Sequence, residues 1–272
     1  MSTLIDWPVP DPVLPPSVDP ALADAAVAAS RAYARARLAH TRAELADEVA
    51  EGADGTPTML VDRLVEDAIA ETAERHRVNL LSEEAGFVDR GSAVTLVVDP
   101  MDGSANAAAG VPLCCFGGVL AVDGRATEAL TTWLDTGRAW HAVAGEPTPY
   151  RTTGRAAAAG ASVSLLRPKP GSRDPWWRVA TQAGRVRILA STVLESALVA
   201  EGAIDAFCDP GSDTHRIVDL ATALVTVPAA GGAVLDALGR PLELDPDLTR
   251  RWSGVVAASR PLADELAALI AG

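Results

Sequence analysis

Hydrophobic residues follow two different spacings along the first half of the chain. From residue 19 to about 50, alanine and leucine mix with charged residues, with Asp19 placed as an N-cap and Pro20 as the first helical residue, which predicts a helix. After a glycine-bounded turn, helical spacing returns from about Thr58 to His76. Apolar runs then predict strands in VNLL, VTLVVDP, LCCFGGVLAV and the stretch 130–143.

In the second half, predicted strands and helices alternate. ASVSLL, RVRILA and IDAFCD are typical of strands, and GAVLDALG of two short strands around a turn. DPWWRVATQAG, STVLESALVAEG and RIVDLATALVTVPAAGG predict helices. This alternation indicates an α/β layered fold. Pro147 to Gly160 is rich in Pro, Gly, Thr and Ala, so we place a boundary there. The predicted parts are an extended proline-rich arm (1–18), an N-terminal half (19–150) and a C-terminal half (151–272).

Composition narrows the class of protein. The 272 residues are 49% hydrophobic with a formal net charge of −13, which argues against disorder and against binding to nucleic acid or an anionic membrane. No apolar run has the roughly 18–20 residues of a membrane span. The acidic, proline-broken start fits neither a signal nor a transit peptide, so we expect a cytoplasmic protein. Three cysteines suit neither a disulfide framework nor a zinc site, and Cys114 and Cys115 are expected to be buried thiols.

The segment DPMDGSAN, residues 99–106, carries the most chemical information. Asp99 and Asp102 follow an apolar strand and can converge on one point, while Gly103 permits close approach of the backbone to a ligand. The amides of Gly103 and Ser104 are then expected to bind phosphate at a helix N-terminus. Carboxylates beside a phosphate repel it unless a divalent cation lies between them, which favours Mg²⁺. The alternative is that both aspartates only cap a turn.

Other carboxylates stand in unusual positions. Glu83 and Glu84 follow a predicted strand, although the alternative is that this acidic pair simply lies in a solvated loop, as such pairs commonly do. Asp62 falls at the edge of the apolar arc of its helix, where it is either a satisfied core-edge group or a group directed into a site. Asp219 lies among apolar residues near a helix start, where aspartate is also favoured by the helix dipole.

These segments together resemble the inositol monophosphatase family of metal-dependent sugar-phosphate phosphatases. DPMDGSAN is similar to its metal-binding signature, and SEEAG, RVRILASTVLESALVAEGAIDAF and RIVDLATALVTVPAAGGAVLDALGRPLE follow in the family's order, as does the helix GTPTMLVDRLVEDAI upstream. The resemblance is strongest to the archaeal and actinobacterial branches with fructose-bisphosphatase-like activity, and it covers about residues 54 to 245. It implies a five-layer αβαβα sandwich, a homodimer and hydrolysis of a small polyol or sugar phosphate by metal-activated water.

The resemblance also implies a role for each matching residue. Two to three Mg²⁺ ions would be held by Glu83, Asp99, the Met101 carbonyl, Asp102 and Asp219. Asp62 and Ser104 would orient and deprotonate the attacking water, and the substrate side would be formed by Arg187, Ser191, Thr192 and Asp209. Ser104, Ala190 and Val218 stand where the family favours threonine, glycine and tryptophan, which leaves the carboxylates in place and the substrate open.

Alternatives within and outside the enzyme class remain. A nucleotide-directed relative would act on adenosine 3′,5′-bisphosphate or NADP, and another relative on histidinol phosphate. A catalytically inactive phosphosugar-binding or regulatory member is disfavoured because all the carboxylates of the signature are present.

Overall fold

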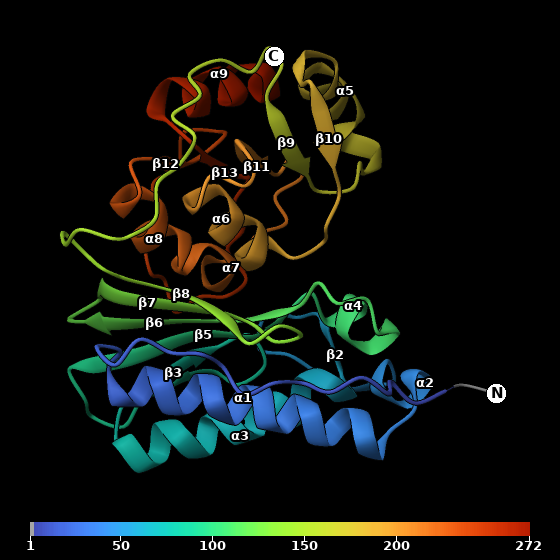
Figure 1. The fold of residues 1–272 in the computed structure, drawn as a ribbon, viewed down its shortest axis with the longest axis vertical. Helices are drawn as coiled ribbons and strands as arrows, with labels where there is room; N and C mark the ends of the chain where they lie inside the picture. Colours follow the sequence, from blue (N-terminus) through green and yellow to red (C-terminus); the bar gives the residue numbers. More distant parts are fainter. Residues whose placement is uncertain (1–2) are drawn as a thin grey trace.

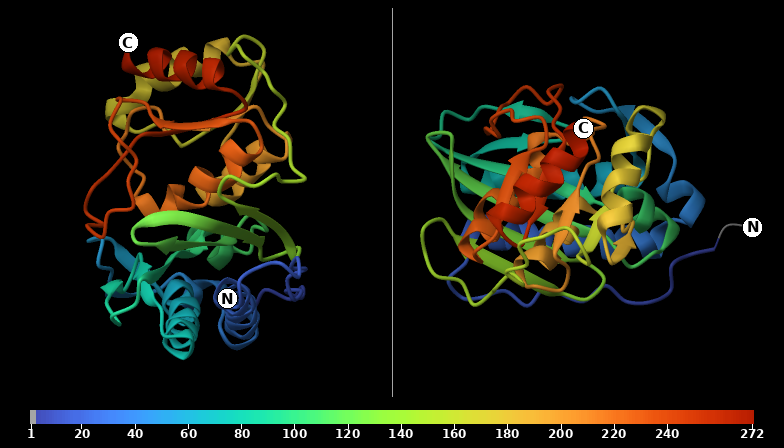
Figure 2. Two further views of the ribbon diagram at one scale, coloured as in Figure 1. Left: turned by 90° about the vertical axis from the view of Figure 1, so that its left-hand side faces the viewer. Right: turned by 90° about the horizontal axis from the view of Figure 1, so that it is seen from above.

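Helices and sheets alternate in five stacked layers in the computed structural model, which describes residues 3–272 (Figure 1). Helices α1 and α3 form an outer layer, and a six-stranded sheet covers them. Helices α6, α7 and α8 lie between this sheet and a second, five-stranded sheet, and α5 and α9 close the opposite side. Figure 2 shows the same layers from the side. The predicted αβαβα sandwich is therefore confirmed.

The first 150 residues supply the outer helices and the larger sheet. Its strand order is β4-β3-β5-β6-β7-β8, with β3 parallel to β5 and the other neighbours antiparallel. The helices are α1 (Pro20–Ala39), α2 (Arg42–Leu45), α3 (Leu60–His76) and α4 (Ser104–Ala109). The strands are a small hairpin of β1 (Glu48–Glu51) and β2 (Pro57–Met59), followed by β3 (Asn79–Ser82), β4 (Gly86–Val88), β5 (Val94–Asp102), β6 (Cys115–Val122), β7 (Arg125–Trp133) and β8 (Arg138–Val143).

The remaining residues form the smaller sheet and the helices on its two faces. Its order is β10-β9-β11-β13-β12, parallel through the first three strands and antiparallel in the last two pairings. The strands are β9 (Ser162–Leu165), β10 (Arg185–Arg187), β11 (Ala206–Cys208), β12 (Ala233–Asp236) and β13 (Gly254–Ala257). The helices are the 3₁₀ turn η1 (Pro170–Ser172), α5 (Arg173–Gln182), α6 (Thr192–Ala200), α7 (Ile217–Ala221), α8 (Ala223–Ala229) and α9 (Arg260–Ala271).

The first helix begins as the sequence predicts and ends earlier. The Asp19 side chain accepts a hydrogen bond from the Ala21 amide, and Pro20 is the first helical residue. The helix stops at Ala39, however, so the prediction of helix to about Ala50 is wrong. Residues 48–51 form β1 instead, because pairing with β2 outweighs the local preference for helix.

Strand β5 continues beyond the proline at which the sequence predicted its end. Its pairing with β6 is regular up to Asp99 opposite Gly117, then shifts so that Asp102 lies opposite Cys115. This irregularity accommodates Pro100, which has no amide hydrogen to donate to a ladder. Residues three apart on a regular strand would face opposite sides of the sheet. The bulge is therefore what allows Asp99 and Asp102 to approach the same region.

The C-terminal third departs from its predictions in three places. The single helix predicted over RIVDLATALVTVPAAGG is divided into α7 and α8 at Thr222. GAVLDALG supplies one strand, β12, rather than two, because the residues after Asp236 turn back. Strand β13 and helix α9 lie in a region for which the sequence suggested no element, and they complete the second sheet and cover it.

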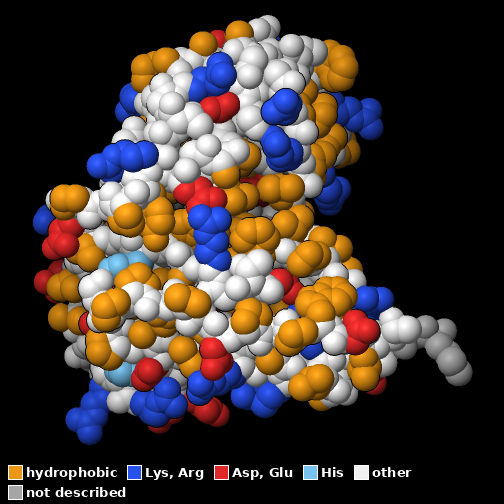
Figure 3. All heavy atoms as spheres, viewed as in Figure 1, with side chains coloured by type: hydrophobic (Ala, Val, Ile, Leu, Met, Phe, Trp, Pro, Cys, Tyr) orange, Lys and Arg blue, Asp and Glu red, His pale blue; other side chains and the backbone are white. Residues whose placement is uncertain are grey.

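Hydrophobic clusters between the layers hold them together. One lies between α1, α3 and the larger sheet, a second between that sheet and the central helices, and a third between the smaller sheet and the outer helices α5 and α9. Figure 3 shows a recess in the outline where the two halves meet. Residues 3–18 form neither helix nor strand and lie against the first half, with Ile5 buried. The first two residues of the predicted arm lie outside the described residues.

Candidate active site

Acidic side chains from three elements meet where the two halves face each other. Glu83 follows β3, Asp99 lies near the end of β5 and Asp219 lies in the first turn of α7. Because β3 and β5 are parallel neighbours, their carboxyl ends reach the same edge of the sheet. One ligand atom from each of the three residues lies within 4.8 Å of the others. The structure thus brings together residues more than a hundred positions apart.

Two of the site aspartates occupy equivalent positions on different helices. Asp62 is the third residue of α3 and accepts a hydrogen bond from the Met59 amide at 3.2 Å through Oδ2. Asp219 is the third residue of α7 and accepts from the Arg216 amide at 2.8 Å, again through Oδ2. Each carboxylate therefore caps its own helix with one oxygen. The helix-cap alternative and a role in a site are compatible, because the second oxygen is left for other partners.

Burial raises the pKa of several of these carboxylic acids. Burial, reinforced by Asp102 and Glu83, raises the pKa of Asp99 well above its usual range. Burial also raises the pKa of Glu83 to about 8, although Arg216 opposes the shift. For Asp62, burial outweighs a hydrogen bond from Ser104 and gives a pKa of about 6. Grouped acids with raised pKa values are a mark of functional sites, because evolution otherwise avoids burying like charges together.

The Asp99 side chain supplies the test of whether a metal ion fits here. It is 2% exposed, and its buried Oδ1 atom has no hydrogen-bond partner among the described residues. An unpaired buried carboxylate oxygen is costly, and a divalent cation is the group that satisfies it best. The carboxylates of Glu83, Asp99 and Asp219, which lie close together, are the donors that Mg²⁺ and similar hard cations prefer. The residues present therefore fit the predicted metal.

Asp102 lies beside this cluster, and both of its carboxylate oxygens accept hydrogen bonds. Its Oδ1 accepts from the Thr192 amide at 3.1 Å, and its Oδ2 accepts from the Val193 amide at 2.9 Å and from the Ser191 hydroxyl. Asp102 thus caps α6 and joins the two halves. The structure therefore brings the predicted metal ligand Asp102 together with two predicted substrate contacts. Ser191 and Thr192 both donate hydrogen bonds to the Asp102 carboxylate.

The other predicted residues have the following positions. Ser104 begins α4, and its hydroxyl donates to the Met101 carbonyl at 2.9 Å. Gly103, with a φ of +86°, can only be glycine, since a Cβ atom would lie 2.6 Å from the Leu113 carbonyl oxygen. Arg187 donates to the Ser162 hydroxyl. Asp209 is fully buried and holds its own loop, accepting from the amides of residues 212 and 214.

Sequence reasoning missed the cation at the centre of the site. The Arg216 guanidinium donates to Glu83, to Asp219 at 3.0 Å and to Asp54 at 2.9 Å. Burial lowers its pKa, but Asp219 and Glu83 outweigh burial and keep it well above the usual value. One signal was available, because a basic residue at a helix start opposes the helix dipole and needs an acidic partner.

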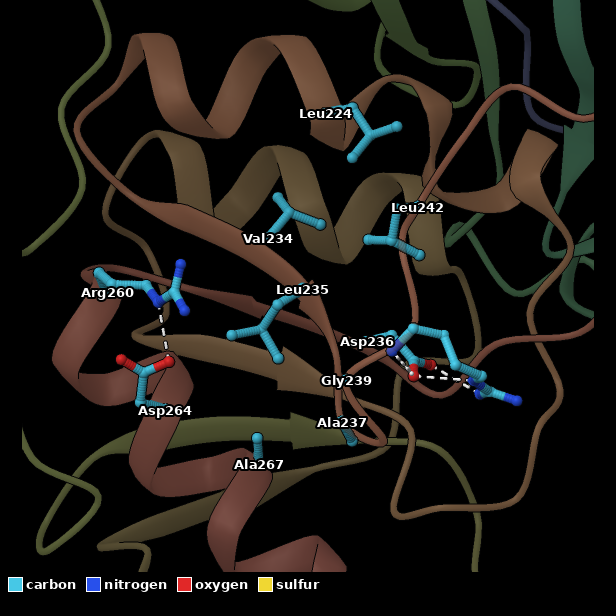
Figure 4. Close-up of a pocket in the computed structure, with 11 residues that line it drawn as sticks. Leu224, Val234, Leu235, Asp236, Ala237, Gly239, Leu242, Arg260, Asp264 and Ala267 are labelled. Atoms are coloured by element: carbon cyan, nitrogen blue, oxygen red, sulfur yellow. Dashed lines mark hydrogen bonds and ion pairs between the residues drawn. The ribbon is translucent and has the colours of Figure 1, made fainter.

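A cavity of about 450 Å³ lies elsewhere, in the C-terminal half (Figure 4). It is lined by β12, by the segment that follows it and by residues of α8 and α9, including Leu224, Val234 and Leu242. Its charged groups satisfy one another, since Arg260 donates to Asp264 at 2.8 Å and Arg240 to Asp236 at 2.7 Å. With no surplus charge and no cluster of acids, this cavity offers less chemistry than the carboxylates between the halves.

Comparison with known proteins decides the family. The family model described as "Inositol monophosphatase family" matches residues 20–271. The chain belongs to the inositol monophosphatase family. A fructose-1,6-bisphosphatase/inositol-1-monophosphatase from Thermococcus kodakarensis is 30% identical over 224 residues, which are 79% of this chain and 84% of that protein. The inositol-1-monophosphatase ImpA of Mycolicibacterium smegmatis is also 30% identical, over 69% of this chain and 71% of its own length.

Solved structures of the family share the fold. A crystal structure described as inositol monophosphatase-fructose 1,6 bisphosphatase has a TM-score of 0.74 at 26% identity, covering 84% of this chain and 92% of that one. The extragenic suppressor protein suhB of Bartonella henselae reaches 0.76 at 21% identity, covering 92% and 96%. The predicted family is confirmed, and its members' names support the predicted class, a hydrolase of sugar or polyol phosphate monoesters.

Proposed function

We propose that this protein is a Mg²⁺-dependent phosphomonoesterase that acts on small polyol or sugar phosphates of the inositol phosphate and fructose 1,6-bisphosphate class. The observation that carries the proposal is the group formed by half-buried Glu83 and buried Asp99 and Asp219, with one oxygen of Asp99 that has no partner among the described residues, in a chain of this family. A buried acid cluster of this kind needs a cation, and a cation is what allows a phosphate to approach acids.

In this proposal Glu83, Asp99 and Asp219 hold the metal, with the Met101 carbonyl and Asp102 completing the ligands. Bound Mg²⁺ would lower the pKa of a coordinated water and neutralise phosphate charge. Asp62 accepts the proton of the attacking water at its Oδ1 atom, since Oδ2 caps α3. The Ser104 hydroxyl, which donates to the Met101 carbonyl in the structure, would turn to Asp62 to orient that carboxylate.

The substrate side is proposed from the residues around α4 and α6. The amides of Gly103 and Ser104 would bind the phosphate, because the positive φ of Gly103 directs the backbone into the first turn of α4. Ser191 and Thr192, held against Asp102, would border the same space from the opposite half. Arg187 and Asp209 are proposed as contacts to the sugar or polyol. A homodimer is also proposed, and the 65% exposed Trp177 is one residue available for its interface.

A nucleotide-directed activity is the second candidate. A bifunctional NADP phosphatase/NAD kinase from Methanococcus maripaludis is 26% identical over 77% of this chain, which spans 42% of that longer protein. A solved family member, described as bound to 2′AMP, is 23% identical. Substrates carrying a ribose phosphate therefore belong in the same assay.

The proposal is tested by phosphate release from a panel of esters. Inositol 1-phosphate, fructose 1,6-bisphosphate, histidinol phosphate, NADP and adenosine 3′,5′-bisphosphate are compared in Mg²⁺ and in excess chelator. We expect release from inositol phosphate or fructose bisphosphate to exceed the others and to disappear with chelator. Equal release in chelator would contradict the metal dependence. A preference for NADP or adenosine bisphosphate would favour the second candidate.

A further inference from the structure

Arg216 makes an unusual set of contacts for a residue beside a metal centre. Its Nη1 donates to Glu83 Oε1 and to Asp54 Oδ2, and its Nη2 and Nε donate to the two oxygens of Asp219 at 3.0 and 3.3 Å. Its side chain is 17% exposed. One guanidinium thus joins three carboxylates that come from the β1–β2 turn, the turn after β3 and α7.

Two of those three carboxylates belong to the acid cluster. Glu83 and Asp219 are the partners of Arg216 and also members of the group whose ligand atoms lie within 4.8 Å of one another. A divalent cation and a guanidinium that use the same carboxylates repel each other at short range, and burial strengthens this repulsion. The two cations therefore compete for Glu83 in particular, because the Arg216 Nη1 atom that donates to Glu83 also donates to Asp54.

Asp54 provides a place for the guanidinium once that contact is broken. Asp54 is 4% exposed, and its Oδ1 accepts from the Thr56 amide and hydroxyl at 2.8 Å. Its Oδ2 accepts from Arg216 and, at 3.2 Å, from Arg251. This carboxylate is fixed independently of Arg216, and it lies outside the acid cluster. Arg216 can leave Glu83 while its charge stays paired with Asp54.

We propose that Arg216 is a displaceable counter-cation of the metal centre, which neutralises Glu83 and Asp219 without metal and gives up Glu83 when a divalent cation binds. This inference rests on the metal centre of the proposed function. It makes metal affinity a balance between two cations, so Arg216 weakens metal binding while it stabilises the metal-free protein. A purely structural arginine would instead hold Asp219 in place and strengthen metal binding.

The test is metal binding without substrate. Titration calorimetry and the electron paramagnetic resonance signal of free Mn²⁺ give the affinity of the tightest site, and thermal denaturation in chelator gives the stability of the metal-free protein. The variant is Arg216→Gln, which keeps the backbone amide that donates to Asp219 and so leaves the start of α7 intact. Arg251→Gln is the matched control, because Arg251 contacts Asp54 but is not a partner of Glu83 or Asp219 in the described ion pairs.

We expect Arg216→Gln to bind Mn²⁺ roughly tenfold more tightly or better, because a short-range repulsion between two cations has been removed. The metal-free variant should melt at a lower temperature than the parent, and Mn²⁺ should raise its melting temperature by more. Arg216→Lys, which keeps the charge, should show a smaller gain. Arg251→Gln should bind Mn²⁺ within about twofold of the parent, a change that corresponds to less than 1 kcal/mol.

Unchanged or weaker Mn²⁺ binding by Arg216→Gln would overturn the inference. Phosphate release by the unmodified protein, measured in parallel, separates this failure from that of the proposed function. If the protein hydrolyses the esters but Arg216→Gln gains no affinity, only the inference fails. If Arg216→Gln gains affinity while the protein releases no phosphate from any ester, only the proposed function fails.

Discussion

One group of buried charges lies in the N-terminal half and another lies between the two halves, and the two groups differ in how their charges are balanced. Arg37 and Asp135 are almost fully buried and pair one to one at 3.0 Å. The Asp135 side chain also accepts from the Trp7 indole and the Cys114 thiol, and the Arg37 guanidinium lies over the rings of Trp7 and Tyr33. This pair ties the N-terminal arm to α1 and to the turn after β7.

The acid cluster of the candidate site has no such balance. Glu83 and Asp219 share one half-buried cation, Arg216, which also pairs with Asp54. One oxygen of Asp99 has no partner among the described residues, whereas both oxygens of Asp135 are bonded. A balanced buried pair maintains the fold, and a buried excess of negative charge is retained for a ligand that supplies positive charge. Substitutions in the two groups should therefore have opposite consequences.

Asp99→Asn should produce the largest loss of activity with little loss of stability. We expect phosphate release to fall by at least about 100-fold, because even the loss of an outer-shell partner costs 10–100-fold in a metal site. The metal-free protein should melt at the same or a higher temperature, since asparagine never has to carry a negative charge among the neighbouring acids. Phosphate release and thermal denaturation in chelator measure the two effects, with the exposed Asp67→Asn as control. Normal turnover would show that Asp99 is not part of the site.

Asp135→Asn should have the opposite effect, a large loss of stability with little change in metal binding. It leaves the buried Arg37 without its charged partner, and we expect a loss of about 3–5 kcal/mol of unfolding free energy with unchanged Mn²⁺ affinity. Urea denaturation measures the loss. Replacing both residues, Arg37→Met with Asp135→Leu, should recover part of it, because an apolar pair has no buried charge to compensate. A double variant as unstable as the single one would mean that packing of Trp7 and Tyr33, not charge, dominates this group.

Glu195 should make a smaller contribution to the free energy of unfolding, one that changes with pH. Burial raises its pKa to about 8, although hydrogen bonds from the Ser164 hydroxyl and the Ser191 amide oppose the shift. A folded pKa above the unfolded value means that its contribution to stability is complete below about pH 4.5 and is lost as pH rises through about 8. Between pH 5 and 8 the parent should lose up to about 3 kcal/mol from this group.

Comparing Glu195→Gln with the parent measures this effect. The variant should lose less stability over the same pH range, because glutamine does not titrate. Glu243→Gln, at an exposed position, is the control and should follow the parent. Parallel stability curves for the parent and Glu195→Gln would show that Glu195 does not titrate in this range.

Much of the fold was predictable because it rests on local patterns. The cap at Asp19 and Pro20, the helix to His76 and the apolar runs of β3, β5 and β6 lie where spacing and capping preferences place them. The ends of elements were less predictable. Pairing between strands converted residues 48–51 into β1 and carried β5 through Pro100, and this pairing depends on the partner strand rather than on the residue pattern of the strand itself.

The candidate site likewise has one part that could be predicted from the sequence and one part that could not. Its carboxylates could be named from the sequence, because acids after strands and at helix starts are unusual among apolar neighbours, and because the family signature contains them. The engagement of Asp102 with the first turn of α6 could not be named, since its partners lie about 90 positions away. The same holds for Arg216, whose contact with Asp54 spans 162 positions.

The sequence alone determined the α/β fold class, the family and the set of acidic residues, because these depend on residue type and on spacing within one element. Only the tertiary structure decided which hydrogen-bond and ion-pair partners those acids have. It set Arg216 among Glu83, Asp219 and Asp54, and it left one oxygen of Asp99 without a partner in the part of the chain that the structure describes. The physical reason is that burial and charge balance depend on which distant segments pack together, and a side chain's partners across a domain interface leave no periodic trace in the chain.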